Sequence, residues 1–429
     1  MVNNAVLQFT DRAFLARESM ASLEASLPAS MLAIVVLGFF QSVVAYTGTF
    51  VAQYYGAGDL RKCRESLRAG NLLAIVFGLL SLLAIPLGDY VFEAFSEGAD
   101  VIARQKSYYS ICTAGGIFLY GQMAAQSYFT GLGKTRIVFW VNVIGNLFNV
   151  ILDPFLIFGW CGLPRLGITG AALATVASTA LQWIILDSAV RRDFRLQSET
   201  SCGPRKGIDL GLLLKILRFG LPSGGYSVLN IVSFTVFVFV TGRVGHLEQA
   251  VSNAVFSVCY LLFAPMEGFA LGAQTLVGQA RGRGDDEEAR RVGLRTMAIG
   301  GVLAVIVSIL AVLLRHPILS LFAPDDPAAA LSFHELGSTL FLLMAAWQVF
   351  DATDIIISGA LKGAGDTKFV MWWMVFNAFV LWLPLVWLVR SWNNTMPALW
   401  STMILYVAVL CLGSVVRWLG NRWKSIKVL

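Results

Sequence analysis

The sequence predicts an all-α integral membrane protein with twelve transmembrane helices in two repeated six-helix lobes. Two observations lead to this prediction. Of the 429 residues, 57% are hydrophobic and 14% charged, with a mean hydropathy of +0.70, whereas soluble domains carry about 25% charged residues. Two motifs also recur across half the chain. Membrane chains built from two like halves are typical of transporters that bind their cargo where the repeats meet.

Two pairs of motifs carry the internal repeat. Val51-Ala-Gln-Tyr-Tyr-Gly-Ala-Gly-Asp59 returns 226 positions later as Val277-Gly-Gln-Ala-Arg-Gly-Arg-Gly-Asp285. Gly131-Leu-Gly-Lys-Thr-Arg136 returns 232 positions later as Gly363-Ala-Gly-Asp-Thr-Lys368. All four lie between apolar segments, and the second pair is predicted to form tight cytoplasmic turns. A phosphate-binding loop is excluded at Lys134, because Tyr128 replaces the first glycine of that motif.

Apolar segments of about 20 residues, enough to cross roughly 30 Å of hydrocarbon, recur along the whole chain. We predict spans at 25–54, 68–92, 104–130, 137–160, 168–190, 212–241, 248–278, 294–322, 333–361, 369–389 and 396–416. A shorter segment at 1–16 makes twelve. At the 226-residue offset Met1 corresponds to Ser227, yet the second half begins its first span at Leu212. We therefore expect either a start upstream of Met1 or a truncated, inactive chain.

The basic residues predict the topology. With the amino terminus inside, 24 Lys and Arg fall in inner segments and 7 in outer loops, which places both termini in the cytoplasm. We predict a multi-pass protein of the bacterial cytoplasmic (inner) membrane, with an N-lobe at 1–190, a cytoplasmic linker at 191–211, a C-lobe at 212–417 and a cytoplasmic tail at 418–429. The net charge of +6 reflects this topology, and we expect no nucleic-acid partner. No disulfide is expected, because the six cysteines are dispersed over spans and loops.

A polar stripe marks the fifth predicted span. Asn142, Asn146, Asn149 and Asp153 are spaced by 4, 3 and 4, which places them on one helix face. The second-half positions at an offset of 232 are Met374, Ala378, Leu381 and Leu385. The polar stripe is therefore specific to the first half and is not required by the repeated architecture. The asparagines suit either function or bridging between helices, whereas a buried Asp153 requires a proton, a cation or a basic partner.

Other carboxylates also fall inside predicted spans, where ionisable groups are costly and often functional. Asp11 corresponds to Phe237 in the repeat; the alternative is a solvated or salt-bridged residue near the outer surface. Asp351 and Asp354 lie at i and i+3 on one face of the tenth span. Glu267 lies in the middle of the eighth span, where it would bind a cation or cap a break at the nearby proline.

The chain shows no pattern typical of an enzyme. Its three histidines, His246, His316 and His334, fall in three different outer loops. A metal-dependent or nucleophilic active site needs such groups to be clustered. We therefore predict no catalytic residue and no cofactor apart from a transported ion.

Taken in order, the motifs resemble those of the multidrug and toxic compound extrusion (MATE) family over essentially the whole chain. Besides the two repeats, the matching segments are Asn149–Gly159, Gly167–Thr175, Phe219–Pro222 and Gly359–Thr367. The resemblance implies two six-helix lobes around a central cavity. It also implies export of cationic amphiphiles in exchange for Na⁺ or H⁺.

The resemblance also assigns residues. Asp11 falls on the acidic position of span 1, Asn149 and Asp153 fall on the polar pair of span 5, and Thr175 matches a nearby polar position. These four would form the ion-coupling site, and Asp11, Asn149 and Asp153 would be metal ligands if the ion is Na⁺.

In the second lobe, Asp351 falls on an acidic position that one bacterial branch uses. The acid that this branch places in span 7 is replaced here by Asn230, which favours the first lobe as the coupling site. The residues that we expect to line the substrate cavity are Asn146, Asn230, Glu267, Trp347, Asp351 and Asp354. Phe350 would add a second aromatic wall.

These observations predict a secondary antiporter that lies in the lipid bilayer, exports organic cations or drugs in exchange for Na⁺ or H⁺, and works as a monomer. The alternative is a flippase for lipid-linked precursors. Such cargo requires basic residues in the cavity, and Arg12 is the one that we expect within the spans. A receptor or purely structural role does not account for carboxylates confined to non-repeated positions of the spans.

Overall fold

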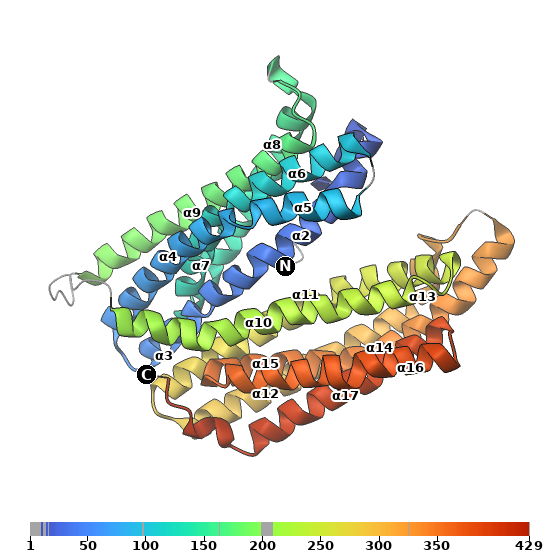
Figure 1. Cartoon of the computed structure of the whole chain (residues 1–429). Coiled ribbons are helices and arrows are strands. Elements are labelled where there is room, and N and C mark those ends of the chain that lie inside the picture. The colour runs from blue at the N-terminus through green and yellow to red at the C-terminus, as the bar shows by residue number, and fades with distance from the viewer. Residues whose placement is uncertain are drawn as a thin grey trace. The chain divides into compact units, whose positions relative to one another are not determined.

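The computed structural model contains helices and, in the residues that it describes, no strands (Figure 1). These residues are 10–11, 14–15, 17–96, 98–162, 164–198, 209–324 and 326–428. The helices of the first half are α2 (Met20–Ala45), α3 (Thr47–Gly56), α4 (Leu60–Leu82), α5 (Ile85–Phe95), α6 (Ala99–Ala114), α7 (Gly116–Gly131), α8 (Thr135–Phe158), the short η1 (Trp160–Gly162) and α9 (Ile168–Ser198). Those that follow are α10 (Leu210–Thr241), α11 (His246–Gly282), α12 (Asp286–Leu313), α13 (Arg315–Ser320), α14 (Pro327–Ala364), α15 (Thr367–Val375), η2 (Phe376–Trp382), α16 (Leu383–Trp392), α17 (Met396–Leu419) and η3 (Arg422–Ser425).

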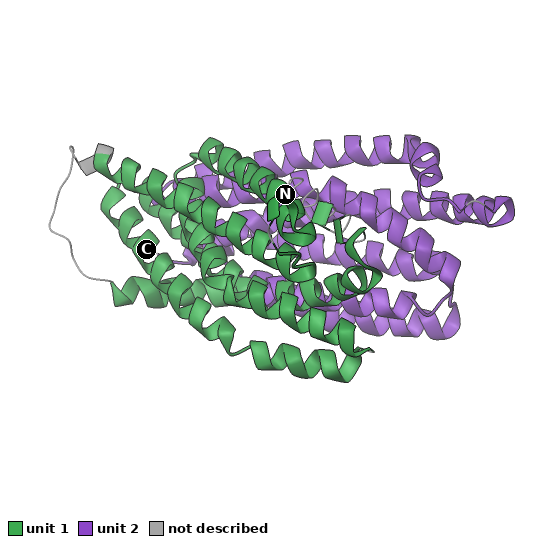
Figure 2. Ribbon diagram, turned by 90° about the horizontal axis from the view of Figure 1, so that it is seen from above, with its two compact units in different colours: residues 1–224, 429 green, residues 225–428 purple. Residues whose placement is uncertain are grey.

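The chain divides into two compact units, one formed by Met1–Gly224 and the other by Gly225–Val428 (Figure 2). The division falls inside α10, whose first turns pack in the first unit. There Phe219 stacks on Tyr46, with ring centroids 6.4 Å apart. The first eight residues of the predicted linker, 191–198, continue α9, and 199–208 lie outside the described residues.

Ten helices of the described residues are long and apolar enough to cross a membrane. The predicted span at 1–16 lies mostly outside these residues. The predicted span at 104–130 consists of α6 and α7, each 16 residues long, separated by Gly115. Gly115 keeps a right-handed helical backbone, with φ −71° and ψ −6°, so that the two short helices follow each other closely. The all-helical prediction is confirmed.

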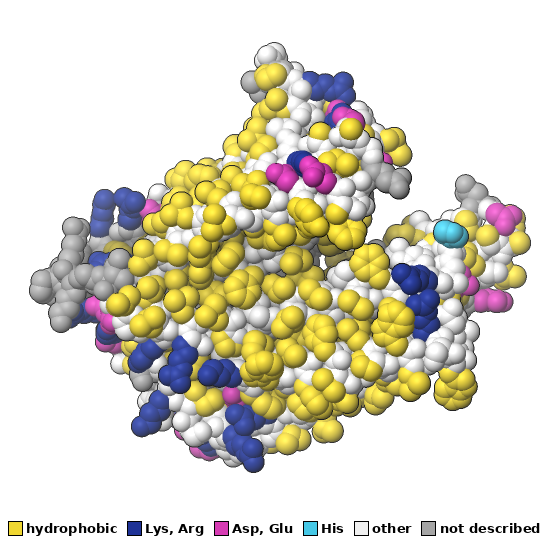
Figure 3. Space-filling model, viewed as in Figure 1, with side chains coloured by type: hydrophobic (Ala, Val, Ile, Leu, Met, Phe, Trp, Pro, Cys, Tyr) yellow, Lys and Arg dark blue, Asp and Glu magenta, His cyan; other side chains and the backbone are white. Residues whose placement is uncertain are grey.

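Apolar side chains cover much of the molecular surface (Figure 3). Leu79, Ile184 and Val302 are each about 60% exposed (60%, 59% and 61%). Large apolar patches of this kind are rare on soluble monomers, and hydrocarbon is the solvent that covers them in a membrane protein. Lys and Arg gather instead at the ends of the helices on the viewed face.

The repeated motifs form the same turn in both units. Between α3 and α4, Gly58 adopts φ +76° and Asp59 caps α4 by accepting a hydrogen bond from the Lys62 amide at 2.9 Å. Between α11 and α12, Gly284 also adopts φ +76° and Asp285 caps α12 in the same way. A positive φ favours glycine, and an aspartate satisfies free amides at a helix start. Each motif is therefore a helix stop followed by a helix start.

The second pair of turns is held by ion pairs of opposite polarity. In the first unit, Lys134 after α7 pairs with Asp193 of α9, which also accepts a hydrogen bond from the Tyr128 hydroxyl at 2.9 Å. In the second unit, Asp366 stands at the position equivalent to Lys134 and accepts a hydrogen bond from Arg417 Nε of α17 at 2.7 Å. In each unit an ion pair thus connects the last membrane helix, α9 or α17, to a repeated turn.

A π-helix breaks the register of the repeat. Within η2, the Leu383 amide donates to the Ala378 carbonyl, five residues back, so this turn holds one residue more than an α-turn. Side chains beyond it shift by one position along the buried face. Trp382 and Val386 are buried (2% and 0% exposed), whereas Leu381 is 43% exposed. The prediction that Leu381 and Leu385 correspond to Asn149 and Asp153 is therefore wrong by one residue. The corresponding residues are Trp382 and Val386.

Candidate functional site

The polar stripe of α8 faces the interior of the first unit. Asn149 and Asp153 are fully buried and Asn146 is 9% exposed, while the opposite face presents apolar side chains such as Trp140, which is 61% exposed. This arrangement follows from the 4–3–4 spacing, which repeats at nearly the period of an α-helix.

Asn149 connects two carboxylates. Its amide orientation is assigned from its partners: the side-chain nitrogen donates to Asp153 Oδ2 at 3.3 Å and to Asp11 Oδ1 at 3.2 Å, and the oxygen accepts from the Thr175 backbone amide at 3.2 Å. The two carboxyl groups also contact each other. In the part of the chain that the structure describes, Asp153 Oδ1 is buried without a hydrogen-bond partner. The structure thus brings together all four residues of the predicted ion-coupling site.

The junction between α8 and α9 fixes this geometry. Helix α8 ends at Gly159, which adopts a left-handed conformation with φ +74°. The returning chain then pairs with the end of α8, because the amides of Leu166 and Gly167 donate to the carbonyls of Leu156 and Ile157 at 3.0 and 3.2 Å. These bonds hold the start of α9 beside α8, and about two turns further along α9 the Thr175 amide reaches Asn149.

Tyr108 of α6 is a neighbour of this site that sequence reasoning missed. Its ring packs on the apolar cluster around Leu15 and Ile157. Its hydroxyl group lies in the electrostatic environment of Asp11 and Asp153. The sequence indicates no role for Tyr108 beyond packing, since a tyrosine in an apolar span is ordinarily a packing residue.

The other asparagines of the stripe belong to a chain of amides between helices. Gln122 of α7 donates to Asn142 at 3.5 Å and to Gln182 of α9, and Gln182 donates to Asn146 at 3.3 Å. Gly145 makes room for this network, because a Cβ there would lie 2.0 Å from the Gln182 side chain. For Asn142 and Asn146 the structure favours the bridging interpretation.

The carboxylates of the second unit lie near a lysine. Asp354 is 1% exposed and hydrogen-bonds with Ser414, and the Asp354 Oδ1 atom has no partner among the described residues. Lys362 lies in the last turn of α14 with its ammonium 3.9 Å from the centroid of the Tyr226 ring, and its charge acts on Asp354 and Glu267. The expectation of no basic side chain other than Arg12 within the spans is therefore wrong. Arg12 itself lies outside the described residues.

The remaining predicted cavity residues are dispersed over the second unit. Asp351 and Glu267 are half-buried and interact electrostatically. Asn230 is half-buried on α10. Trp347 is 6% exposed within the apolar core, whereas its neighbour Phe350 is 42% exposed. Of this pair, Phe350 presents the accessible ring.

Among the described residues there is no group of three or more His, Cys, Asp or Glu side chains that would hold a metal ion. The first-unit site offers two carboxylates and an amide. Such a set of hard oxygen ligands suits a proton or a weakly held alkali ion rather than a transition metal.

Two repeated helical units with carboxylates buried inside membrane spans define a membrane transporter. The MatE family model matches residues 1–155 and 222–388, and the chain belongs to the MatE family. It is 27% identical over 381 residues to a probable multidrug resistance protein NorM of Bradyrhizobium diazoefficiens, covering 88% of this chain and 81% of that protein. It is 25% identical over 336 residues to the multidrug resistance protein MdtK of Pectobacterium atrosepticum, covering 78% and 72%. The fold is that of a MATE crystal structure in a bent conformation, with a TM-score of 0.85, 17% identity, and 99% and 93% of the two chains covered.

Proposed function

We propose that this protein is a secondary antiporter that exports organic cations in exchange for Na⁺ or H⁺. The coupling cation binds at Asp11 and Asp153, with Asn149 as a neutral partner and Thr175 behind it. The observation that carries the proposal is the buried contact between the two carboxyl groups, with one Asp153 oxygen left without a partner. Two like charges repel strongly at short range away from water, so a cation or a shared proton stabilises this pair.

Asn149 gives the site two states. In the assigned amide orientation its NH₂ group donates to both carboxylates, which suits a pair that holds a proton or no ion. Rotation of the amide by about 180° would turn the oxygen toward the carboxylates and complete an oxygen cage for Na⁺. Since both carboxylates contribute to holding the ion, a conformation of the first unit that moves Asp11 away from Asp153 binds the ion less tightly, and such differential affinity couples ion binding to conformation.

Export of drugs is supported by the relatives named above, which are a probable multidrug resistance protein and a multidrug resistance protein. A cationic cargo is supported by the acidic side chains Asp351, Asp354 and Glu267 of the second unit, together with the exposed ring of Phe350. Carboxylates near aromatic rings attract hydrophobic cations. Lys362 balances part of this negative charge and therefore does not favour the lipid-precursor alternative.

The test uses purified protein in liposomes containing a fluorescent lipophilic cation. Transport is followed under an imposed pH gradient and then under an imposed Na⁺ gradient. We expect one gradient to drive transport in the wild type and neither to do so in Asp153→Asn. Asp100→Asn is the matched control, because Asp100 is an exposed aspartate whose side chain is 68% accessible.

Full activity of Asp153→Asn would overturn the assignment of the coupling site. Absence of transport under both gradients, with folded wild-type protein, would overturn the antiport proposal and favour the flippase. Both termini are proposed to lie in the cytoplasm and the protein to act as a monomer; labelling of cysteines introduced at the ends from each side of intact cells tests the orientation.

A further inference from the structure

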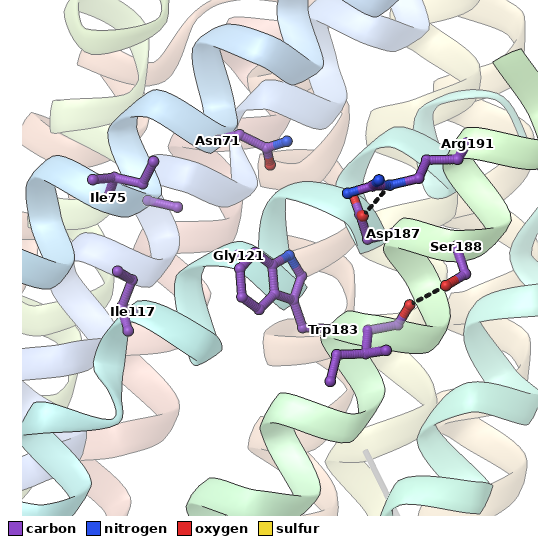
Figure 4. Close-up of a pocket in the computed structure, with 10 residues that line it drawn as sticks. Asn71, Ile75, Ile117, Gly121, Trp183, Asp187, Ser188 and Arg191 are labelled. Carbon is purple, nitrogen blue, oxygen red and sulfur yellow. Dashed lines mark hydrogen bonds and ion pairs between the residues drawn. The ribbon is translucent and has the colours of Figure 1, made fainter.

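A groove of about 570 Å³ lies on the first unit between α4, α7 and α9 (Figure 4). Its lining residues do not include any of the candidate ion-coupling residues. In the close-up, Ile75 and Ile117 lie at one end, Asp187 and Arg191 lie at the other, and the Trp183 ring lies between them. The groove therefore has an apolar end and a charged end.

The apolar end is open rather than filled by the protein. Ile75 is 50% exposed and Ile184 is 59% exposed. Trp183 forms the floor, and Gly121 allows its ring to approach α7, because a Cβ on Gly121 would lie 2.7 Å from the indole. In a membrane protein, exposed apolar surface of this kind is covered by acyl chains.

The charged end is an ion pair whose side chains keep hydrogen-bonding capacity for a ligand. Arg191 Nε donates to Asp187 Oδ2 at 2.7 Å, and the side chains are 76% and 32% exposed. Within the described residues, the structure records no further hydrogen bond to the two terminal guanidinium nitrogens or to Asp187 Oδ1. Asn71, which also lines the groove, has its side-chain oxygen buried without a partner. The groove thus offers donors for an anion and acceptors for a cationic N–H group, with no net charge.

The charged end also lies near the level of the lipid headgroups. Arg191 is seven residues before Ser198, the last residue of α9, which corresponds to about 10 Å of helix. At the same end of the helices, Arg64 of α4 lies over the Phe194 ring at 5.0 Å. Basic residues gather at the ends of spans near the headgroups.

We propose that this groove binds phosphatidylethanolamine from the leaflet that these basic residues face. The phosphate accepts hydrogen bonds from Arg191, and the ammonium group donates to Asp187. One acyl chain lies over Trp183 toward Ile75 and Ile117. A zwitterionic headgroup matches the neutral ion pair, whereas an anionic headgroup would meet the Asp187 carboxylate without an ammonium group to offset it.

The test measures lipid binding and does not depend on transport. The purified full chain in detergent is mixed with dioleoyl phosphatidylethanolamine, phosphatidylglycerol or phosphatidylcholine, and bound lipid is counted by native mass spectrometry. Phosphatidylcholine is the matched probe, since its quaternary ammonium has the same charge and no N–H donor. We expect phosphatidylethanolamine to bind about tenfold more tightly than phosphatidylcholine, as for the loss of one charge-assisted hydrogen bond.

Variants distinguish binding of the lipid headgroup from binding of the acyl chain. Asp187→Asn should abolish the preference for phosphatidylethanolamine and shift it toward phosphatidylglycerol, since Arg191 then lacks its counter-charge. Asp100→Asn, which alters another Asp–Arg pair with i, i+4 spacing, should leave the preference unchanged. Ile75→Trp, at an exposed position, should weaken the binding of all three lipids, because the indole would fill the groove. Equal binding of phosphatidylethanolamine and phosphatidylcholine to the wild type would overturn the proposal, as would a wild-type preference for phosphatidylglycerol or an unchanged preference in Asp187→Asn.

Discussion

Phe237 and Trp382 stack in the second unit with ring centroids 5.2 Å apart and ring planes 27° apart. By the repeat, Phe237 stands where the first unit has Asp11, and the π-helix places Trp382 where it has Asn149. Tyr406 also stacks on Trp382, with ring centroids 4.4 Å apart. The same place in the architecture therefore holds two carboxylates bridged by an amide in one unit and a closed aromatic core in the other.

Replacing Trp382 with alanine should lower the free energy of unfolding by about 3–5 kcal/mol, the usual loss for a large buried aromatic side chain. Thermal unfolding in detergent, followed by circular dichroism, measures the change. Trp372→Ala is the control, since Trp372 is 63% exposed and its loss leaves no cavity. An equal effect of both substitutions would show that the stack does not stabilise the second unit.

Asn149→Ala should reduce gradient-driven transport by at least about tenfold. The change removes the donor that Asp11 and Asp153 share, and each charge-assisted hydrogen bond contributes about 1.5–3 kcal/mol. Initial rates in liposomes at matched protein content give the comparison. Asn142→Ala is the matched control from the same stripe and should retain transport, because among the described residues the Asn142 side chain contacts Gln122, by a hydrogen bond of 3.5 Å, and neither carboxylate. Similar losses in the two variants would mean that the stripe acts as packing alone.

Gly145→Ala should destabilise the first unit by about 1–3 kcal/mol, as expected for overpacking. The new methyl group would lie 2.0 Å from Gln182 Nε2, so that the amide network must move. The opposite result is expected for Gly38→Ala in α2, where no atom lies within 4 Å of the new methyl group and alanine favours the helix by up to about 1 kcal/mol. Apparent unfolding midpoints of the two variants should therefore move in opposite directions.

Asp209 provides a pH-dependent contribution to stability. The hydrogen bond from Lys62 at 2.8 Å, followed by that from the Leu212 amide, lowers the pKa of Asp209 in the folded protein. Its stabilising effect is therefore complete above the unfolded pKa of about 3.9 and is lost as the pH falls through the lower folded value. Unfolding midpoints measured from pH 6 to pH 3 should fall less steeply in Asp209→Asn than in the wild type. Parallel curves would contradict this role.

Much of the fold followed from patterns with a direct physical cause. Long apolar segments predicted the spans, and the repeated Gly-x-Gly motif predicted the turns after Gly131 and Gly363, because a positive φ is a local requirement. The grouping of Asn149 with Asp153 followed from helix periodicity. Their proximity to Asp11 and Thr175 came from the family resemblance, since no local pattern relates helices so far apart in the chain.

Three features could not be read from the sequence. The π-helix depends on tertiary packing around Trp382, and one additional residue in a turn leaves no local signature. Lys362 seemed to belong to a cytoplasmic turn, because the extent of α14 to Ala364 is decided by packing. Gln122 and Gln182 drew no attention because each is isolated in an apolar span, and their hydrogen bonds form between different helices.

The opposite polarity of the Lys134–Asp193 and Asp366–Arg417 pairs has a consequence for exchanging segments between the halves. Each turn carries the charge opposite to that of its partner on the last membrane helix of the same unit. The turns of the two halves are therefore not interchangeable. Grafting the Lys134 turn into the second half would place a lysine beside Arg417, where two positive charges repel.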